Sequence, residues 1–351
     1  MDYKQKELYL RALQTTVREA GGAILNYKGP IVDTGYELGH ETSTIDEYAR
    51  ITTLDRLESN FRKMGLKFEG LYDFELGSLR TVPKSTGPLG EQPLVLDMDE
   101  IDGTTNTKRA IAARILAPHI NYAPKAGVCI ALLESRNLGS ILASAFYSFS
   151  YDATFSGIKT EETFTAYMDD VYLCRHKFSK PLGDDRYRII VTDYSNKNQI
   201  GIGMIRQALV KSKKFARVYG GCRSSSMDII DIVLNQYDAY IDLRALWEDS
   251  GAMLQAFDVV AVVPVALGAG LEISDIEGRF LDNYTHDSSI PLVVGRPGIK
   301  DEILGVIHPV IEQTKLAASQ KRVGYIGLGF LNCEITSWYK LMEFICAGWR
   351  L

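Results

Sequence analysis

A dense group of carboxylates follows an apolar stretch in the first third of the chain. Residues 94–102 read LVLDMDEID, so four carboxylates lie within six residues. We expect an apolar strand here, with Asp99 and Asp102 at its end converging on one point. Carboxylates gathered at one point repel one another unless a cation lies between them. Hard oxygen ligands of this kind select magnesium, manganese or calcium.

The residues after these carboxylates suit an anion. Residues 103–106 read GTTN. Gly103 allows the backbone to approach a ligand closely, and the amides of Gly103, Thr104 and Thr105 would point at an anion as a helix begins. A cation held beside an anion pocket can catalyse phosphoryl transfer to water. The alternative is a solvated acidic turn with an Asp helix cap, but the apolar strand before it and the GTTN after it favour the metal site.

Two motifs resemble a known family. Residues 99–106, DEIDGTTN, look like the DPIDGTTN signature of the inositol monophosphatase superfamily, which includes fructose-1,6-bisphosphatases and nucleotide bisphosphate phosphatases. Glu100 replaces the usual proline. Farther along, 257–278 contains FDVVA, AG and DIEG at the spacing of the family's W-D-x-A-A…A-G…D-x-x-G stretch. The resemblance makes Asp258 the distal metal ligand, at the N-terminus of a helix.

The resemblance also implies a complete set of site residues. The implied metal ligands are Glu75, Asp99, Ile101, Asp102 and Asp258. Asp46 would serve an auxiliary metal, and Asp73 is the alternative to Glu75. The catalytic residues would be Glu75, Thr104 and Asp99, with Thr104 hydrogen-bonding the attacking water and Glu75 acting as its base. The sequence departs from the family here: Ser43 replaces a lysine, and only one glutamate of a Glu-Glu pair remains.

A third group of residues would bind the substrate or its phosphate. The resemblance implies Asp102, Gly103, Thr104, Thr105, Arg223, Ser224 and Arg244. Arg244 ends the stretch DAYIDLR at 238–244, which looks like a strand of archaeal-type members. For Ser224, a role as a helix N-cap is an equally good interpretation.

The implied activity is hydrolysis of a small phosphate monoester, inositol monophosphate and/or fructose 1,6-bisphosphate, by metal-activated water. The implied cofactor is Mg²⁺, two or three ions per site, for which Mn²⁺ can substitute. One alternative is a phosphatase acting on 3′(2′),5′-bisphosphate nucleotides or NADP. Another is a catalytically degenerate family member that binds a phosphorylated ligand or acts through oligomer assembly.

Apolar periodicity and turn residues predict the elements that position these side chains. Helices are expected at 7–28, 45–64, 196–212, 224–234 and 300–316. Strands are expected at 94–98, 127–133, 140–147, 151–155, 188–193, 239–242 and 291–295, while 257–267 could be either. This mixture indicates an α/β (α+β) protein, and the resemblance implies a layered αβαβα sandwich. We expect an N-terminal α+β domain with the metal motif at 1–185, a C-terminal α/β domain at 186–318, and an additional tail at 319–351.

Composition narrows the partners. The chain has a net charge of −5 and 46% hydrophobic residues, and it lacks the basic stripe that nucleic-acid binding needs. No segment reaches the roughly 18 apolar residues of a membrane span. The five cysteines form no CxxC pair, which predicts reduced thiols and a cytoplasmic protein. We therefore expect a small phosphorylated metabolite as ligand, no nucleic acid and no membrane. The apolar, aromatic tail predicts a homodimer.

Overall fold

The computed structural model describes residues 1–37, 40–67, 70–73, 78–80, 94–116, 123–161, 163–173, 186–192, 199–222, 224–246 and 253–327. The chain divides into two compact units, Met1–His308 and Pro309–Leu351. The predicted boundary near 185 lies outside the described residues, and the predicted boundary at 318 stays a prediction. All elements discussed below belong to the first unit, except that the helix Ile299–Gly327 begins in the first unit and continues into the second.

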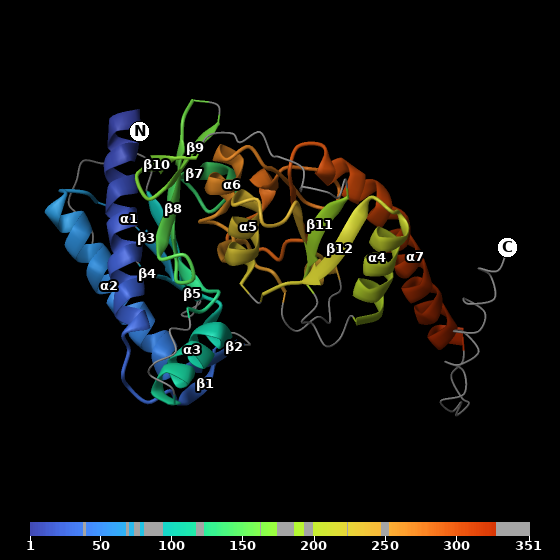
Figure 1. The fold of residues 1–351 in the computed structure, drawn as a ribbon, viewed down its shortest axis with the longest axis horizontal. Helices are drawn as coiled ribbons and strands as arrows, with labels where there is room; N and C mark the ends of the chain where they lie inside the picture. Colours follow the sequence, from blue (N-terminus) through green and yellow to red (C-terminus); the bar gives the residue numbers. More distant parts are fainter. Residues whose placement is uncertain are drawn as a thin grey trace. The chain divides into compact units, whose positions relative to one another are not determined.

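An eight-stranded sheet forms the centre of the N-terminal half (Figure 1). Its order is β10-β9-β8-β7-β6-β5-β3-β4, and only β3 and β5 pair in parallel. The strands are β3 (Gly70–Asp73), β4 (Ser78–Arg80), β5 (Val95–Asp102), β6 (Gly127–Leu133), β7 (Ile141–Ser148), β8 (Ala153–Lys159), β9 (Phe164–Met168) and β10 (Val171–Tyr172). The middle strands β6 and β7 are buried along their whole length, as a sheet covered on both faces requires.

Helices α1 (Tyr3–Leu25) and α2 (Thr44–Lys63) cover one face of this sheet. The Asp2 side chain caps α1 by accepting a 2.8 Å hydrogen bond from the Gln5 amide. The helix continues through Gly21, where a Cβ would lie 2.2 Å from the Tyr147 ring of β7. Glycine therefore lets α1 lie close against the sheet, and this packing outweighs its low helix propensity.

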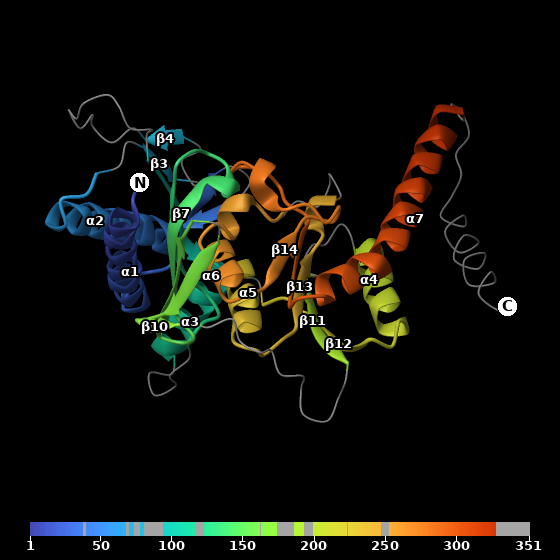
Figure 2. The ribbon, with the colours of Figure 1, turned by 90° about the horizontal axis from the view of Figure 1, so that it is seen from above.

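A second sheet of five strands has the order β12-β11-β13-β15-β14 (Figure 2). Its strands are β11 (Tyr187–Val191), β12 (Phe215–Gly220), β13 (Ala239–Asp242), β14 (Glu272–Ser274) and β15 (Leu292–Gly295). Helices α5 (Ser225–Val233) and α6 (Val263–Gly268) contact each other and this sheet, and α6 also contacts β7, β8 and β9. Helix α4 (Gln199–Lys211) packs on β12. The predicted mixed α/β layering is confirmed.

The remaining elements complete the described chain. They are the hairpin β1 (Asp33–Glu37) and β2 (His40–Ser43), helix α3 (Thr104–Leu116), the 3₁₀ turns η2 (Leu138–Ser140), η3 (Arg244–Leu246), η4 (Ala256–Asp258) and η5 (Leu281–Asn283), and helix α7 (Ile299–Gly327). None of the helices in the described ranges combines the length and apolarity needed to cross a membrane.

Three sequence expectations about elements were wrong. Strand β5 does not end at Met98 but continues to Asp102, so the acidic residues lie within the strand. The strand expected at 151–155 instead spans Ala153–Lys159, so Gly157 lies inside it; a Cβ there would lie 2.5 Å from Pro264 of α6, so the glycine serves close packing. The stretch 257–267 is neither one helix nor a strand, because η4, a turn and α6 follow one another there.

Candidate active site

A bulge at the end of β5 decides where its carboxylates point. Side chains alternate between the two faces of a strand, so residues three apart, such as Asp99 and Asp102, would normally face opposite sides. In the pairing with β6, Asp99 lies opposite Cys129 but Asp102 lies opposite Gly127, so β5 carries one extra residue. The Ile101 amide donates a 3.1 Å hydrogen bond to Asp99 Oδ1. The bulge therefore turns Asp99 and Asp102 to the same face.

The N-terminus of α5 holds the carboxylate of Asp102. Asp102 Oδ2 accepts hydrogen bonds from Ser224 Oγ and from the Ser226 amide, both at 2.8 Å. Ser224 is also the N-cap of α5, since its hydroxyl accepts a bond from the Met227 amide at 3.3 Å. The N-cap interpretation of Ser224 is confirmed, and the same hydroxyl also bonds to Asp102. Its predicted contact with the substrate stays a prediction.

Asp258 lies beside this pair, at the end of η4. The turn η4 packs against β5. Asp258 caps this turn, because its Oδ2 accepts a 2.9 Å hydrogen bond from the Gln255 amide. The Ser226 hydroxyl donates to the main-chain oxygen of Asp258 at 2.7 Å. Asp258 was expected at the N-terminus of a helix; it lies instead in a 3₁₀ turn, five residues before α6 begins at Val263.

Electrostatics links the three aspartates. Burial raises the pKa of Asp102 to about 6, against the hydrogen bonds from Ser224 and Ser226, which lower it. Burial, and then the neighbouring charge of Asp102, raise the pKa of Asp258 to about 7. Burial also raises the pKa of the Cys129 thiol, and the charges of Asp99, Asp102 and Asp258 raise it further. The pKa of one buried thiol is therefore raised by the charges of all three carboxylates.

These carboxylates match the donor chemistry of a hard divalent cation. Burial raises the pKa values of Asp102 and Asp258 by disfavouring their charged forms, and a bound cation would favour the charged forms. Within the part of the chain that the structure describes, no group of three or more His, Cys, Asp or Glu side chains could hold a metal ion alone. Magnesium commonly uses one or two carboxylates together with waters and substrate phosphate, so a partial protein set is compatible with Mg²⁺.

The backbone after β5 leads directly into a helix. Gly103 has φ of +95°, and a Cβ there would lie 3.0 Å from the Lys125 carbonyl oxygen, so glycine is required. The amides of Asn106 and Thr107 donate to the Gly103 oxygen, which begins α3. Helix geometry leaves the preceding amides of Thr104 and Thr105 without partners in the helix. The Thr104 hydroxyl donates to the Ile101 carbonyl at 3.2 Å, and Thr105 is exposed.

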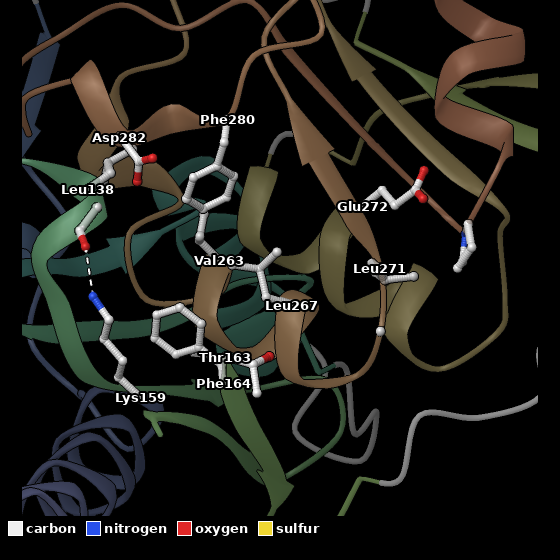
Figure 3. Close-up of a pocket in the computed structure, with 13 residues that line it drawn as sticks. Leu138, Lys159, Thr163, Phe164, Val263, Leu267, Leu271, Glu272, Phe280 and Asp282 are labelled. Carbon is white, nitrogen blue, oxygen red and sulfur yellow. Dashed lines mark hydrogen bonds between the residues drawn. The ribbon is translucent and has the colours of Figure 1, made fainter. Parts of the chain in front are cut away.

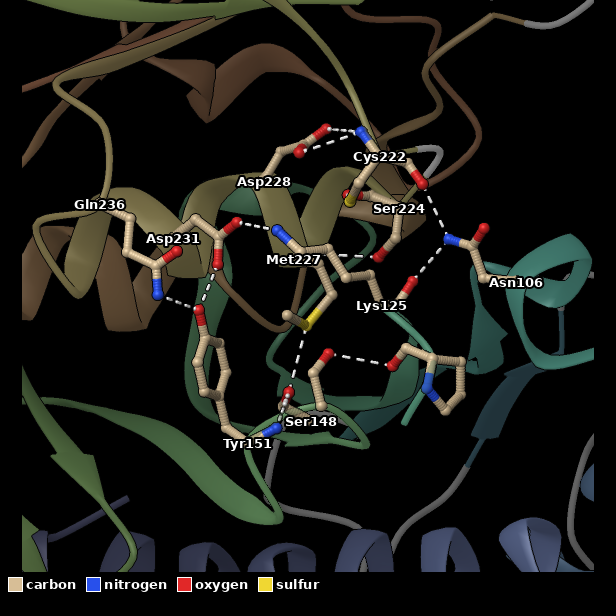
Figure 4. Close-up of polar contacts among 12 residues, drawn as sticks. Asn106, Lys125, Ser148, Tyr151, Cys222, Ser224, Met227, Asp228, Asp231 and Gln236 are labelled. Carbon is tan, nitrogen blue, oxygen red and sulfur yellow. Dashed lines mark hydrogen bonds and ion pairs between the residues drawn. The ribbon is translucent and has the colours of Figure 1, made fainter. Parts of the chain in front are cut away.

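A polar network that the sequence reasoning did not identify ties this motif to α5 (Figure 4). Asn106 Nδ2 donates to the carbonyl oxygens of Lys125 and Cys222, both at 2.7 Å. The Lys125 ammonium pairs with the fully buried Asp231 of α5 at 2.6 Å. The Cys222 amide donates to both carboxylate oxygens of Asp228. The signal for Asn106 was in the GTTN motif. The bond from Asn106 to Cys222 and the pair of Lys125 with Asp231 join residues that are 116 and 106 positions apart, so no local pattern indicates them.

Arg244 is buried and ion-paired, and its predicted contact with the phosphate stays a prediction. Its side chain is only 4% exposed and pairs with the buried carboxylate of Asp242, with a shortest distance of 2.6 Å. Tyr240 donates to the same carboxylate at 2.9 Å. The positive charge of Arg244 lowers the pKa values of Asp102 and Asp258. Arg244 therefore acts on these two carboxylates electrostatically.

The remaining predicted residues fall outside these contacts. Asp46 is 3% exposed and caps α2, where its Oδ2 accepts bonds from the Ser43 amide at 2.8 Å and the Ser43 hydroxyl at 2.6 Å. Asp73 ends β3, but its side chain is not among those described. Glu75 and Arg223 lie outside the described residues. Their predicted roles stay predictions.

A cavity of about 620 Å³ is lined by residues other than Asp99, Asp102 and Asp258 (Figure 3). Its walls come from β8, β9, α6, β14 and the η5 region, and they include Lys159, Phe164, Leu267, Glu272 and Phe280. The Lys159 ammonium donates to the Gly139 carbonyl at 3.1 Å. None of the predicted site residues lines this cavity.

Solved structures resemble this arrangement. Extragenic suppressor protein SuhB from Bartonella henselae is 17% identical, with a TM-score of 0.59 over 85% of this chain and 97% of that one. The chain has the inositol monophosphatase fold. An IMPase from Thermotoga maritima shares this fold at 15% identity and a TM-score of 0.57, covering 86% of this chain and 96% of its own.

A further structure with the inositol monophosphatase fold is an IMPase/NADP phosphatase complexed with Mg²⁺ and phosphate. It is 15% identical, with a TM-score of 0.51 over 79% of this chain and 86% of that chain. No protein-family model matches the sequence, and no curated protein matches it. The likeness is therefore one of fold.

Proposed function

We propose that this protein hydrolyses a small phosphate monoester with the help of Mg²⁺, and that inositol monophosphate and fructose 1,6-bisphosphate are the first substrates to test. The bulge in β5 carries the proposal, because it turns Asp99 and Asp102 to one face. The segment bearing Asp258 packs against that strand. The inositol monophosphatase fold of the chain supports the same activity.

In this proposal no more than two of Asp99, Asp102 and Asp258 would ligate any one Mg²⁺ ion, and Glu75, the Ile101 carbonyl, waters and the substrate phosphate would complete the coordination. Bound Mg²⁺ supplies Lewis acidity and makes water a stronger nucleophile near neutral pH. Ser224 and the Ser226 amide orient Asp102 so that its second oxygen faces the ligand. The amides of Gly103, Thr104 and Thr105 bind the phosphate at the start of α3, where the helix dipole favours negative charge. Thr104 positions the attacking water, and Glu75 takes its proton.

A second substrate class is supported by one comparison. The IMPase/NADP phosphatase is a protein of the same fold, complexed with Mg²⁺ and phosphate. NADP and 3′(2′),5′-bisphosphate nucleotides therefore belong in the substrate panel. The missing family lysine at Ser43 and the single glutamate at Glu75 support the remaining alternative, a family member that binds phosphorylated ligands without turnover.

Phosphate release from this panel is the test, measured with Mg²⁺, with Mn²⁺ and with EDTA. We expect Mg²⁺-dependent release from at least one substrate, and a loss of about a hundred- to a thousandfold in Asp102→Asn, since removal of one transition-state contact typically costs 10²–10³-fold. Asp301→Asn is the matched control, because its side chain is 78% exposed on α7. If the wild-type protein binds these substrates in calorimetry but releases no phosphate, the hydrolase proposal is wrong and the binding-protein alternative is supported.

The homodimer and the cytoplasmic location are proposed on the sequence alone. The tail from 328 onward lies outside the described residues. Deleting 321–351 and measuring the molecular mass by light scattering tests the tail: we expect a dimer to become a monomer, and an unchanged mass would contradict its role.

A further inference from the structure

Ser226 connects two carboxylate-bearing segments that are far apart in the sequence. Its main-chain amide donates to Asp102 Oδ2 at 2.8 Å. Its hydroxyl donates to the main-chain oxygen of Asp258 at 2.7 Å. One residue near the start of α5 thus bonds to the carboxylate on β5 and to the turn that carries the other carboxylate.

The contacts of Ser226 define what kind of role it can play. The residue is 0% exposed. Its hydroxyl proton is committed to the Asp258 oxygen, and its oxygen also lies 3.6 Å from the Cys129 sulfur. A side chain that is 0% exposed does not contact a substrate in this arrangement. It can only fix the positions of the groups that do.

The helix that carries Ser226 is itself firmly anchored. Ser224 caps its N-terminus and bonds to Asp102. Asp228, one turn later, accepts bonds from the Cys222 amide at 3.1 and 3.2 Å. Asp231 pairs with Lys125. Because α5 is held at several points, the Ser226 hydroxyl ties the Asp258 turn to a fixed support.

We propose that Ser226 is a positioning residue that sets the spacing between the Asp102 carboxylate and the Asp258 turn, and thereby the affinity of this site for Mg²⁺. The inference rests on the proposed function, since it takes these aspartates as the cation ligands. Without the hydroxyl, Asp102 keeps its amide bond, but the Asp258 turn loses its tether to α5. Part of the binding free energy of the cation would then be used to order the two carboxylates, so the affinity would fall.

Another buried serine offers a matched control. Ser144 of β7 is also 0% exposed, and its hydroxyl donates to the Ala261 carbonyl at 2.7 Å. Ala261 lies three residues after Asp258 in the same segment. Ser144→Ala and Ser226→Ala therefore each remove one buried hydroxyl, and one equally short bond to a main-chain oxygen. Only the Ser226 bond reaches the residue that carries the carboxylate.

The experiment titrates MgCl₂ into wild type, Ser226→Ala and Ser144→Ala by isothermal calorimetry, without substrate. We expect the Mg²⁺ dissociation constant of Ser226→Ala to rise about five- to tenfold, the equivalent of one net hydrogen bond, and that of Ser144→Ala to stay within about twofold. Thermal unfolding in EDTA should show a similar loss of stability in both variants. In phosphate release, Ser226→Ala should need more Mg²⁺ for half-maximal rate while approaching the wild-type rate at saturation.

The outcomes separate the two ideas. Equal Mg²⁺ affinities for Ser226→Ala and wild type would overturn the positioning role, whether or not the protein is a phosphatase. Weakened Mg²⁺ binding by Ser226→Ala alone, in a protein that releases no phosphate, would support the positioning role and refute the hydrolase. A wild type that binds no Mg²⁺ overturns both.

Discussion

Replacing Asp258 with asparagine should stabilise the metal-free protein at alkaline pH. The folded carboxyl has a pKa of about 7 against its ordinary value of 3.8, because burial and the charge of Asp102 disfavour ionisation. Asparagine carries no charge, and its side-chain oxygen can still accept the bond that the Gln255 amide makes. The variant therefore keeps the local cap while removing the charge.

The sign and size follow from proton linkage. Since the folded pKa is raised, the folded state binds more protons than the unfolded state between pH 4 and pH 7, so stability falls as the pH rises through this window. Each pH unit costs about 1.4 kcal/mol while only the unfolded carboxyl is ionised. From pH 5 to pH 7, the wild type should therefore lose about 2.3 kcal/mol relative to Asp258→Asn, and only about 0.4 kcal/mol more by pH 8.

Urea unfolding in EDTA at pH 5, 6, 7 and 8 measures this difference. Adding Mg²⁺ at pH 8 should stabilise the wild type strongly and the variant weakly, because the cation compensates a charge that asparagine lacks. Asp301→Asn should follow the wild type at every pH, since its carboxylate is solvent-exposed. A constant difference between Asp258→Asn and the wild type from pH 5 to pH 8 would show that Asp258 is not held in a charge-disfavouring site.

Two further substitutions test the supports of the site. Gly103→Ala forces a side chain into φ of +95° with its Cβ 3.0 Å from a backbone oxygen, so we expect a loss of about 1–3 kcal/mol in urea unfolding; unchanged stability would contradict the need for glycine. Lys125→Met leaves the fully buried Asp231 without its ammonium partner and should cost about 3 kcal/mol, whereas Lys108→Met, whose partner Asp33 is 73% exposed, should cost less than about 1 kcal/mol. Equal effects of the two lysine variants in the same assay would argue against a buried ion pair.

The fold followed from the sequence wherever local signals were strong. Helix α1 carries apolar residues at helical spacing, including Leu13, Val17 and Ile24, and all three are fully buried. The prediction failed where packing decided the end of a strand. The strand expected at 151–155 runs on to Lys159, and Gly157 lies inside it because Pro264 of α6 packs against it. Gly21 lies inside α1, as predicted, where the Tyr147 ring packs against it. Propensity describes the isolated segment, and packing overrides it.

The sequence by itself determined which residues bring carboxylates and a glycine turn to the end of β5. It did not determine that Asp99 and Asp102 share a face, since a regular strand would separate them and only the shifted register against β6 brings them together. It also gave no sign that Arg244 pairs with Asp242, or that Ser226 bonds to both carboxylate-bearing segments. Such contacts depend on how strands and helices from distant parts of the chain meet, and this is decided by long-range packing, which no local pattern of residues encodes.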